Sequence, residues 1–293
     1  MLRPLNETRT NAFSQAGEDG VLAEIFDRLN IAQGSFCEFG AWDGQHLSNT
    51  FAFYNKGWNG VYIEGNEARF ADLTRNITRP GTDNFCAWVR TEGVTSLDAL
   101  LAKSHVAKTG VLDLLSIDID SDDLAIWKSL KNFRPKVVII EINPTIPIDV
   151  YFENPQGQFL GNSARSTYEF ARSQDYGLVA TTACNMIFID LRLPHQPLPI
   201  LELTDPTLTF GTRYFFGFDG SLIVKGANDQ GAHMIPDIIR VPWNGARFAQ
   251  PVAKSFRSTS QGKWTRRFWH FFSRIRLTLM HPIAALTGSV HRS

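Results

Sequence analysis

The stretch FCEFGAWDG, residues 36–44, decides the fold of this chain. An apolar run ends there in an acid, Glu38, and two glycines follow, Gly40 and Gly44. Twenty residues after Gly44, a second apolar run ends in another acid, Glu64. Strand, glycine turn, helix, strand and acid is the order in which an open α/β sheet holds an adenosine-containing cofactor. The glycines let the backbone pass close to such a ligand, and the second acid can accept hydrogen bonds from both ribose hydroxyls.

The spacing of the glycines indicates which cofactor to expect. The pattern Glu38-x-Gly40-x-x-x-Gly44 differs from the G-x-G-x-x-G turn that seats a pyrophosphate on a helix N-terminus. Trp42 and Asp43 crowd this turn, and the Asp43 carboxylate would repel a phosphate. A carboxylate at Glu38 suits a ligand with a positive amino group, and S-adenosylmethionine carries an amino group and a sulfonium. We therefore expect S-adenosylmethionine rather than NAD, with an ordinary βαβ unit as the alternative.

Composition indicates a packed protein of a reducing compartment. The 293 residues are 43% hydrophobic, which is ample for the core of one large α/β domain with appendages. The cysteines, Cys37, Cys86 and Cys184, are odd in number and far apart, so we expect buried thiols rather than disulfides or a metal cluster. The polar segment 1–15 and the lack of a long apolar run predict a cytoplasmic location.

Charge is distributed unevenly although the formal net charge is zero. Residues 238–293 contain ten basic residues and no acid, which leaves 19 basic against 29 acidic residues in 1–237. Within the basic part, 263–280 places aromatic and aliphatic side chains on one helical face and arginines mostly on the other. This pattern predicts a helix lying on the inner face of a membrane, and a helix docked on the acidic body or on a second subunit is the alternative. The acidic body argues against nucleic-acid binding.

Strand and helix patterns alternate from residue 35 to residue 143, and two strands, 176–182 and 185–190, then follow at a short interval. This order predicts an α/β fold with a Rossmann-like, doubly wound, mostly parallel sheet and an antiparallel closing strand. We expect the first helix to begin near Ser14 and the second to run through Leu47 to Lys56. We divide the chain into a main domain, 1–190, an extension packed on it, 191–258, and a basic amphipathic tail, 259–293. The extension is expected to contain a hairpin that turns at Asp219-Gly220.

Six motifs in this order resemble the FkbM-family class I methyltransferases over about residues 12–190. They are FSQAGEDG (13–20), the 38–44 turn followed by Ser48-Asn49-Thr50, GVYIE (60–64), VTSLD (94–98), LLSID (114–118) and VIIE (138–141). The resemblance implies a seven-stranded sheet, S-adenosylmethionine as methyl donor, and O-methylation. It further implies a sugar hydroxyl of a glycan or glycoconjugate as acceptor, and with the basic tail a lipid-linked glycan becomes the expected partner.

The resemblance also implies donor-binding roles for particular positions. The turn would surround the methionine part and the sugar of the donor, and Glu64 would hold the ribose hydroxyls. The end of the third strand would lie near the adenine, and the segment before the sheet would close over the donor carboxylate. The implied residues are Gln15, Glu38, Gly40, Ala41, Gly44, Glu64, Cys86 and Ala87. One departure is clear, because the lysine common in the family's K-I-D pattern is Ser116 here.

Acidic side chains gather where the fourth and fifth strands are expected to end. Asp118 and Asp120 are the candidate catalytic residues, because methyl transfer to a hydroxyl requires removal of its proton. Asp120, Glu141 and Asn143 are the candidate ligands of a divalent metal, Mg²⁺, since hard oxygen ligands suit it. The alternative is that Asp118 acts as a base or hydrogen-bonding residue without metal, while the acids after it favour a helix N-terminus.

Two other functions stay open at this point. A metal-dependent hydrolase could use the acids of 118–123. A non-catalytic, Rossmann-like module could use the tail as a membrane adaptor. The combination of Glu38, Gly40, Gly44 and Glu64 favours the methyltransferase, because neither alternative needs a ribose-binding acid.

Overall fold

The computed structural model describes residues 3–144, 146, 148–193, 198–204, 213–216 and 222–225. The chain divides into two compact units, Met1–Gly211 and Thr212–Ser293. In the second unit, β8 (Arg213–Phe216) and β9 (Leu222–Lys225) pair antiparallel, as expected of the hairpin in the extension, and its expected turn at Asp219-Gly220 lies outside the described residues. The basic segment 259–293 and most of the extension 191–258 lie outside the described residues, so the membrane helix stays a prediction.

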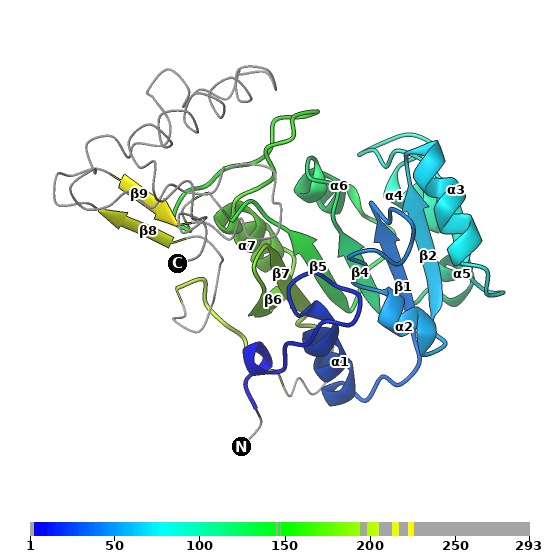
Figure 1. The fold of residues 1–293 in the computed structure, drawn as a ribbon, viewed down its shortest axis with the longest axis horizontal. Coiled ribbons are helices and arrows are strands. Elements are labelled where there is room, and N and C mark those ends of the chain that lie inside the picture. Colours follow the sequence, from blue (N-terminus) through cyan, green and yellow to red (C-terminus); the bar gives the residue numbers. More distant parts are fainter. Residues whose placement is uncertain are drawn as a thin grey trace, which may run out of the picture. The chain divides into compact units, whose positions relative to one another are not determined.

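The first unit is built on a seven-stranded sheet with the strand order β3-β2-β1-β4-β5-β7-β6 (Figure 1). Neighbouring strands from β3 to β5 are parallel, and β7 runs antiparallel to both β5 and β6. The mostly parallel sheet with an antiparallel closing strand is therefore confirmed. Its strands are β1 (Ser35–Phe39), β2 (Asn59–Glu64), β3 (Asp83–Cys86), β4 (Leu114–Ile117), β5 (Val137–Glu141), β6 (Tyr176–Thr181) and β7 (Asn185–Asp190).

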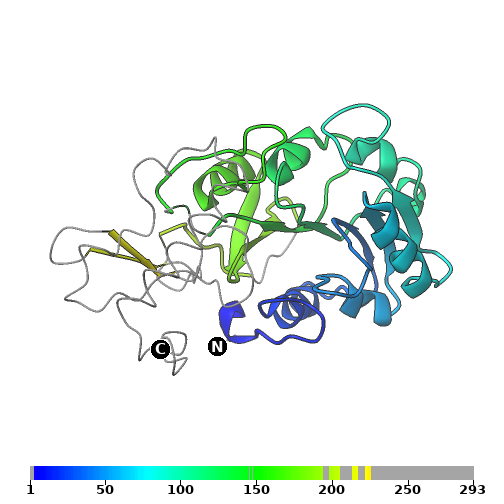
Figure 2. The same ribbon diagram turned by 45° about the horizontal axis from the view of Figure 1, so that its top comes forward.

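Helices cover both faces of this sheet, so that the central strands are buried on both sides (Figure 2). One face packs against α1 (Glu18–Arg28), α2 (Phe51–Asn55) and α3 (Glu67–Asn76). The other face packs against α4 (Leu97–Leu101), α5 (His105–Thr109), α6 (Asp123–Ser129) and α7 (Ala164–Ser173). A short 3₁₀ helix, η1 (Leu5–Glu7), precedes α1.

Two helices begin later than the apolar spacing suggested. α1 begins at Glu18 rather than near Ser14, because the Asp19 carboxylate accepts a hydrogen bond from the Ser14 N–H and holds that segment as a loop. α2 does not include Leu47, whose backbone is left-handed with a φ of 55°. Apolar spacing cannot reveal a side chain that takes the backbone N–H groups a helix would use.

The strand order reverses direction between β1 and β4, since β2 and β3 extend the sheet on one side and β4 and β5 on the other. Ligands of open α/β sheets bind beyond the carboxyl ends of the strands at such a switch point. The predicted functional residues follow these same strand ends. Among the described residues, no helix is both long enough and apolar enough to cross a bilayer.

Candidate functional site

Glu64 ends β2 and links the glycine turn to the start of α3. Its side chain is buried, and its Oε2 accepts a hydrogen bond from the Trp42 N–H at 2.9 Å. Its Oε1 accepts one from the Asn66 N–H at 2.7 Å. Each carboxylate oxygen can accept a second hydrogen bond, so the group is held in one orientation and keeps acceptor capacity. The structure thus brings the predicted ribose acid and the predicted turn into direct contact.

The glycine turn is pressed against the end of β4. Gly40 has a φ of 78°, and a Cβ at this position would overlap the carbonyl oxygen of Asp118. The N–H groups of Gly40 and Ala41 both donate to the Ile63 carbonyl, which fixes the turn on β2 as well. Gly44 is also left-handed, and a Cβ there would lie 2.6 Å from Cγ1 of Ile77. The protein's own packing therefore requires both glycines.

Glu38 is buried under the loop that follows the turn. Its carboxylate accepts hydrogen bonds from the hydroxyls of Ser48 (2.6 Å) and Thr50 (2.8 Å) and from the Asn49 N–H (2.9 Å). The Ser116 hydroxyl of β4 donates to it at 3.4 Å. Burial raises the pKa of Glu38, and these hydrogen bonds oppose the rise. Glu38 thus fastens residues 48–50 to the sheet, a role that sequence reasoning missed although it had singled out the Ser48-Asn49-Thr50 motif.

The end of β3 lies beside Glu64. Cys86 pairs with Glu64 in the parallel ladder, and the Ala87 N–H donates to the Glu64 carbonyl at 3.0 Å. The structure therefore places both residues of the predicted adenine side next to the predicted ribose acid. Cys86 is exposed, so the expectation of three buried thiols is wrong at this strand end, whereas Cys37 and Cys184 are buried.

Gln15 lies half-buried in the loop before α1, and Asp19 organises that loop. The Asp19 Oδ2 accepts hydrogen bonds from the N–H groups of Ala12, Phe13 and Ser14, each at 2.8 Å, and from the Ser14 hydroxyl. The FSQAGEDG motif is thus a self-capped loop in which Asp19 supplies the acceptor.

A second acid of this motif holds the N-terminal segment on the sheet. The buried Glu18 accepts hydrogen bonds from the Thr182 hydroxyl at 2.5 Å and from Nδ2 of Asn185 at 3.1 Å. Arg9 donates to the Thr181 carbonyl at 2.5 Å. We call these three interactions the N-terminal clasp. The sequence carried no signal for it, because its partners are separated by more than half of the chain.

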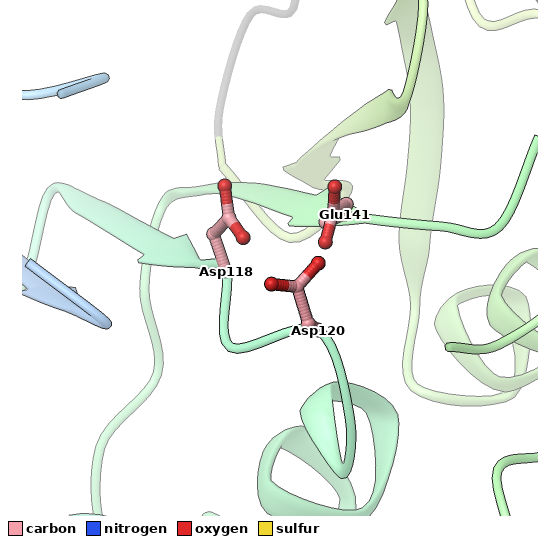
Figure 3. Close-up of side chains that lie close together, drawn as sticks. All are labelled: Asp118, Asp120 and Glu141. Atoms are coloured by element: carbon pink, nitrogen blue, oxygen red, sulfur yellow. The ribbon is translucent and has the colours of Figure 1, made fainter. Parts of the chain in front are cut away.

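Three carboxylates converge at the ends of β4 and β5 (Figure 3). One oxygen from each of Asp118, Asp120 and Glu141 lies within 4.8 Å of the others, and all three residues are half-buried. Asp120 has a left-handed backbone with a φ of 60°, which an aspartate tolerates better than most residues. We call this group the acidic triad. It contains both predicted catalytic residues and two of the three predicted metal ligands.

Burial and acidic neighbours set the pKa values of two members of the triad, Asp118 and Glu141. Burial and the neighbouring charges of Asp123 and Asp120 raise the pKa of Asp118 to about 8. Burial raises the pKa of Glu141 well above its ordinary value, and the charges of Asp118, Asp120 and Asp123 add to the rise. A protonated Glu141 donates a hydrogen bond to Asp118, which favours the charged form of Asp118 and the neutral form of Glu141. The pair therefore holds a proton at neutral pH, in the absence of another cation.

Asp122, Asp123 and Asn143 form hydrogen bonds with groups outside the acidic triad. Asp123 accepts hydrogen bonds from the Ile119 and Ser121 N–H groups, and burial raises its pKa to about 6. Asp122 accepts from the Asn154 amide at 2.8 Å and so ties α6 to the 144–163 loop. Nδ2 of Asn143 donates to the Leu160 carbonyl at 2.7 Å in the same loop. Of the acids in residues 118–123, Asp118 and Asp120 thus belong to the triad, whereas Asp122 and Asp123 are structural hydrogen-bond acceptors.

No protein-family model matches the sequence, and a search among curated proteins finds no match. Among solved structures, the chain is similar to M. capricolum TrmK bound to S-adenosyl-homocysteine, with 12% identity and a TM-score of 0.32. The match covers 57% of this chain and 66% of that chain, which is just under two thirds of its length. It is similar to a Burkholderia thailandensis 1,6-didemethyltoxoflavin-N1-methyltransferase at 13% identity, a TM-score of 0.37 and coverage of 57% and 73%. The glycopeptide N-methyltransferase MtfA in complex with sinefungin matches at 13% identity and a TM-score of 0.36, over 59% of this chain and 86% of that chain.

Proposed function

We propose that this protein is an S-adenosylmethionine-dependent methyltransferase that O-methylates a sugar hydroxyl of a glycan or glycoconjugate. The observation that supports the proposal best is the contact between Glu64 and the glycine turn at the switch point of the sheet. An acid with spare acceptor capacity at the end of β2, beside the β1 turn, is the arrangement that an adenosine ligand needs. The acceptor class and the O-methylation follow from the resemblance of the motifs to the FkbM family.

The residues around the switch point supply complementary functions in this proposal. Glu64 binds the ribose hydroxyls, and the turn at Gly40 and Ala41 lets the donor approach the backbone. S-adenosylmethionine, when bound, supplies an electrophilic methyl group on a sulfonium. Asp118 would accept the proton of the acceptor hydroxyl as the donor's methyl group is transferred to that oxygen. A carboxylate whose pKa is raised to about 8 is a stronger base than an ordinary aspartate, and this strengthens its case as the proton acceptor.

A divalent cation, Mg²⁺, bound by the acidic triad is the metal-dependent form of the proposal, in which Asp118 would be a ligand and the cation would lower the pKa of the acceptor hydroxyl. Three carboxylates within 4.8 Å of one another are the hard oxygen ligands such an ion prefers. Asn185 lies opposite Glu141 in the β5–β7 ladder, and its buried Oδ1 has no hydrogen-bond partner among the described residues. The metal set expected from the sequence, Asp120, Glu141 and Asn143, is extended in this proposal by Asp118.

The decisive experiment measures binding of S-adenosylhomocysteine by calorimetry to the wild type, to Glu64→Gln and to Glu67→Gln. We expect Glu64→Gln to weaken binding by about tenfold or more, because a charged acceptor of two hydroxyls is lost. Glu67 is an exposed acid three residues further on, so Glu67→Gln is the matched control and should bind as the wild type does. Absence of binding to the wild type would contradict the proposal and leave the hydrolase or the adaptor.

Metal dependence is tested separately, by transfer of labelled methyl groups to glycan acceptors after EDTA treatment and after Mg²⁺ is restored. Loss of activity with EDTA and recovery with Mg²⁺ supports the metal, and EDTA-insensitive transfer rules it out.

The proposed membrane contact of the basic segment 263–280 is tested by flotation of the full chain with anionic and with neutral liposomes. Equal flotation with both would contradict it.

A further inference from the structure

The 144–163 loop joins β5 to α7 and contains no helix or strand among its described residues. Connections of this length are uncommon in compact domains, and those that occur are often functional loops. The loop begins three residues after Glu141 of the acidic triad, and Figure 1 shows it in green as it rises beside α6. Its position therefore makes it a candidate for contact with a molecule that reaches the triad.

Hydrogen bonds within the loop hold it in a defined conformation. The Phe152 N–H donates to the Ser163 hydroxyl, and the Ser163 N–H donates to the Phe152 carbonyl, each at 2.9 Å. Nearer the tip, the Oδ1 of Asn154 accepts a hydrogen bond from the Leu160 N–H at 3.1 Å. These bonds join the two sides of the loop, so the tip, residues 155–159, is presented by a fixed frame.

The same frame is attached to both strand ends that carry the acidic triad. Nδ2 of Asn143, two residues beyond the end of β5, donates to the Leu160 carbonyl at 2.7 Å. Asp122, which precedes α6, accepts a hydrogen bond from Nδ2 of Asn154 at 2.8 Å. Phe159 is the neighbour of Leu160 in the chain. It thus lies beside the strand end that bears Glu141 without being part of the triad.

The tip presents an aromatic ring among uncharged side chains. Phe159 is 69% exposed, and Gln156 and Gln158 are exposed as well. Residues 154–163 contain no charged residue and no histidine. An exposed ring on a fixed frame is a large apolar surface of the kind found at ligand contacts. The lack of charge argues against an anionic partner, while the two amides can donate hydrogen bonds to hydroxyl groups and accept them.

A pyranose sugar has a surface that complements this tip. The C–H groups on one side of the ring form an apolar face that can pack on an aromatic side chain, and the hydroxyls at the rim stay free to bond amides. The sugar hydroxyl to be methylated lies at the triad in the proposed function. Because Phe159 lies beside the triad and outside it, a ring stacked on Phe159 belongs to another unit of the acceptor.

We propose that Phe159 stacks on a neutral sugar unit next to the one that is methylated, and that Gln156 and Gln158 bond the hydroxyls of this second unit. The inference rests on the proposed methyltransferase function. It narrows the acceptor to an oligosaccharide of at least two units, and it assigns the 144–163 loop a part in choosing that acceptor.

The test measures binding of the full chain to an array of neutral monosaccharides, neutral oligosaccharides and oligosaccharides that carry carboxylates or phosphates, with S-adenosylhomocysteine present. We expect the wild type to bind its preferred neutral oligosaccharide about tenfold or more tightly than the component monosaccharides. Phe159→Ala should lose this difference, whereas Phe159→Tyr, which keeps an aromatic face, should stay within about threefold of the wild type. Val111 is an exposed apolar residue before the amino end of β4, so Val111→Ala is the matched control and should bind as the wild type does.

Two further measurements separate the loop from the donor site and from stability. Because its side chain is exposed, Phe159→Ala should bind S-adenosylhomocysteine and unfold in urea as the wild type does. Three results overturn the inference: an oligosaccharide preference that Phe159→Ala retains, a preference for anionic sugars, and a loss of stability in Phe159→Ala without a loss of glycan binding. The methyltransferase proposal stands in all three as long as S-adenosylhomocysteine binds.

The wild type alone distinguishes failure of this inference from failure of the proposed function. A wild type that binds S-adenosylhomocysteine but no glycan of the array overturns the inference and the glycan acceptor, and it leaves the methyl donor in place. A wild type that does not bind S-adenosylhomocysteine overturns both the inference and the methyltransferase proposal.

Discussion

On the β1–β2 side of the switch point, buried carboxylates are surrounded by donors, and on the β4–β5 side they face one another. Glu38 and Glu64 each accept hydrogen bonds from hydroxyl or backbone N–H groups. Asp118 instead raises the pKa of Glu141, and the hydrogen bond that a protonated Glu141 donates lowers the pKa of Asp118, so that the two share a proton. The first side is preorganised as it stands. On the second side, the proton shared by Asp118 and Glu141 relieves the repulsion between their carboxylates.

The largest effect is expected where the two sides touch, at Gly40. Gly40→Ala should lower the free energy of unfolding by at least about 3 kcal/mol, because a left-handed alanine is strained and its Cβ overlaps the Asp118 carbonyl. Gly157 is also left-handed but has no heavy atom near its Cβ position, so Gly157→Ala isolates the strain alone, about 1 kcal/mol. Urea denaturation measures both. Equal losses would show that the close approach of the two strand ends does not matter.

A smaller effect is expected from the charge on the β4–β5 side. In EDTA, stability should fall as pH rises from about 4, the ordinary pKa of an aspartate, to about 8, the pKa of Asp118. Between these values the folded protein holds a proton that the unfolded chain has released, so the stabilising contribution is complete at low pH and is lost on deprotonation. Asp118→Asn should reduce this fall by on the order of 1 kcal/mol or more.

The measurement is the urea midpoint of the wild type, Asp118→Asn and Glu67→Gln across this pH range. Glu67 is exposed, and its replacement should leave the slope unchanged. A wild-type stability that rises with pH through this range would contradict the account of the β4–β5 side.

The smallest effect is expected at Asn66, on the β1–β2 side. Its side chain accepts hydrogen bonds from the Ala68 and Arg69 N–H groups and caps α3. Asn66→Ala should cost about 1 kcal/mol, whereas Asn66→Ser, which keeps a capping oxygen, should cost only a few tenths. Both are read from urea denaturation. If alanine and serine were equivalent, the local caps would not be what organises this side.

Periodicity and strand-end chemistry predicted much of this molecule. Apolar runs that end in acids placed β1, β2, β4 and β5, and two closely spaced runs placed the β6–β7 hairpin. Each of these strands has a local apolar pattern that indicates on which of its faces the strand is buried. The structure brings Asp118, Asp120 and Glu141 together at neighbouring strand ends, whereas Asn143, the third expected metal ligand, donates to the Leu160 carbonyl.

The parts that could not be predicted depend on side chains distant in sequence. Nothing local shows that Asp19 caps the loop at Ser14, or that Glu38 takes its donors from residues 48–50. The packing of Trp88 on Gly65 required the β2–β3 register to be known. Sequence spacing identifies which groups reach the same edge of the sheet, whereas the choice of hydrogen-bond partner among them is made by the three-dimensional packing.

The N-terminal clasp has a consequence for synthesis of the chain. Thr182 and Asn185 donate to Glu18 from 164 and 167 residues further on, and Thr181 accepts from Arg9 across 172 residues. At about 5–20 residues per second, the ribosome delivers these partners on the order of 10–30 s after the N-terminal segment. The contacts of Arg9 and Glu18 with this end of the sheet are thus among the last to form, although Phe26 of α1 can already pack on Phe53 and Trp58.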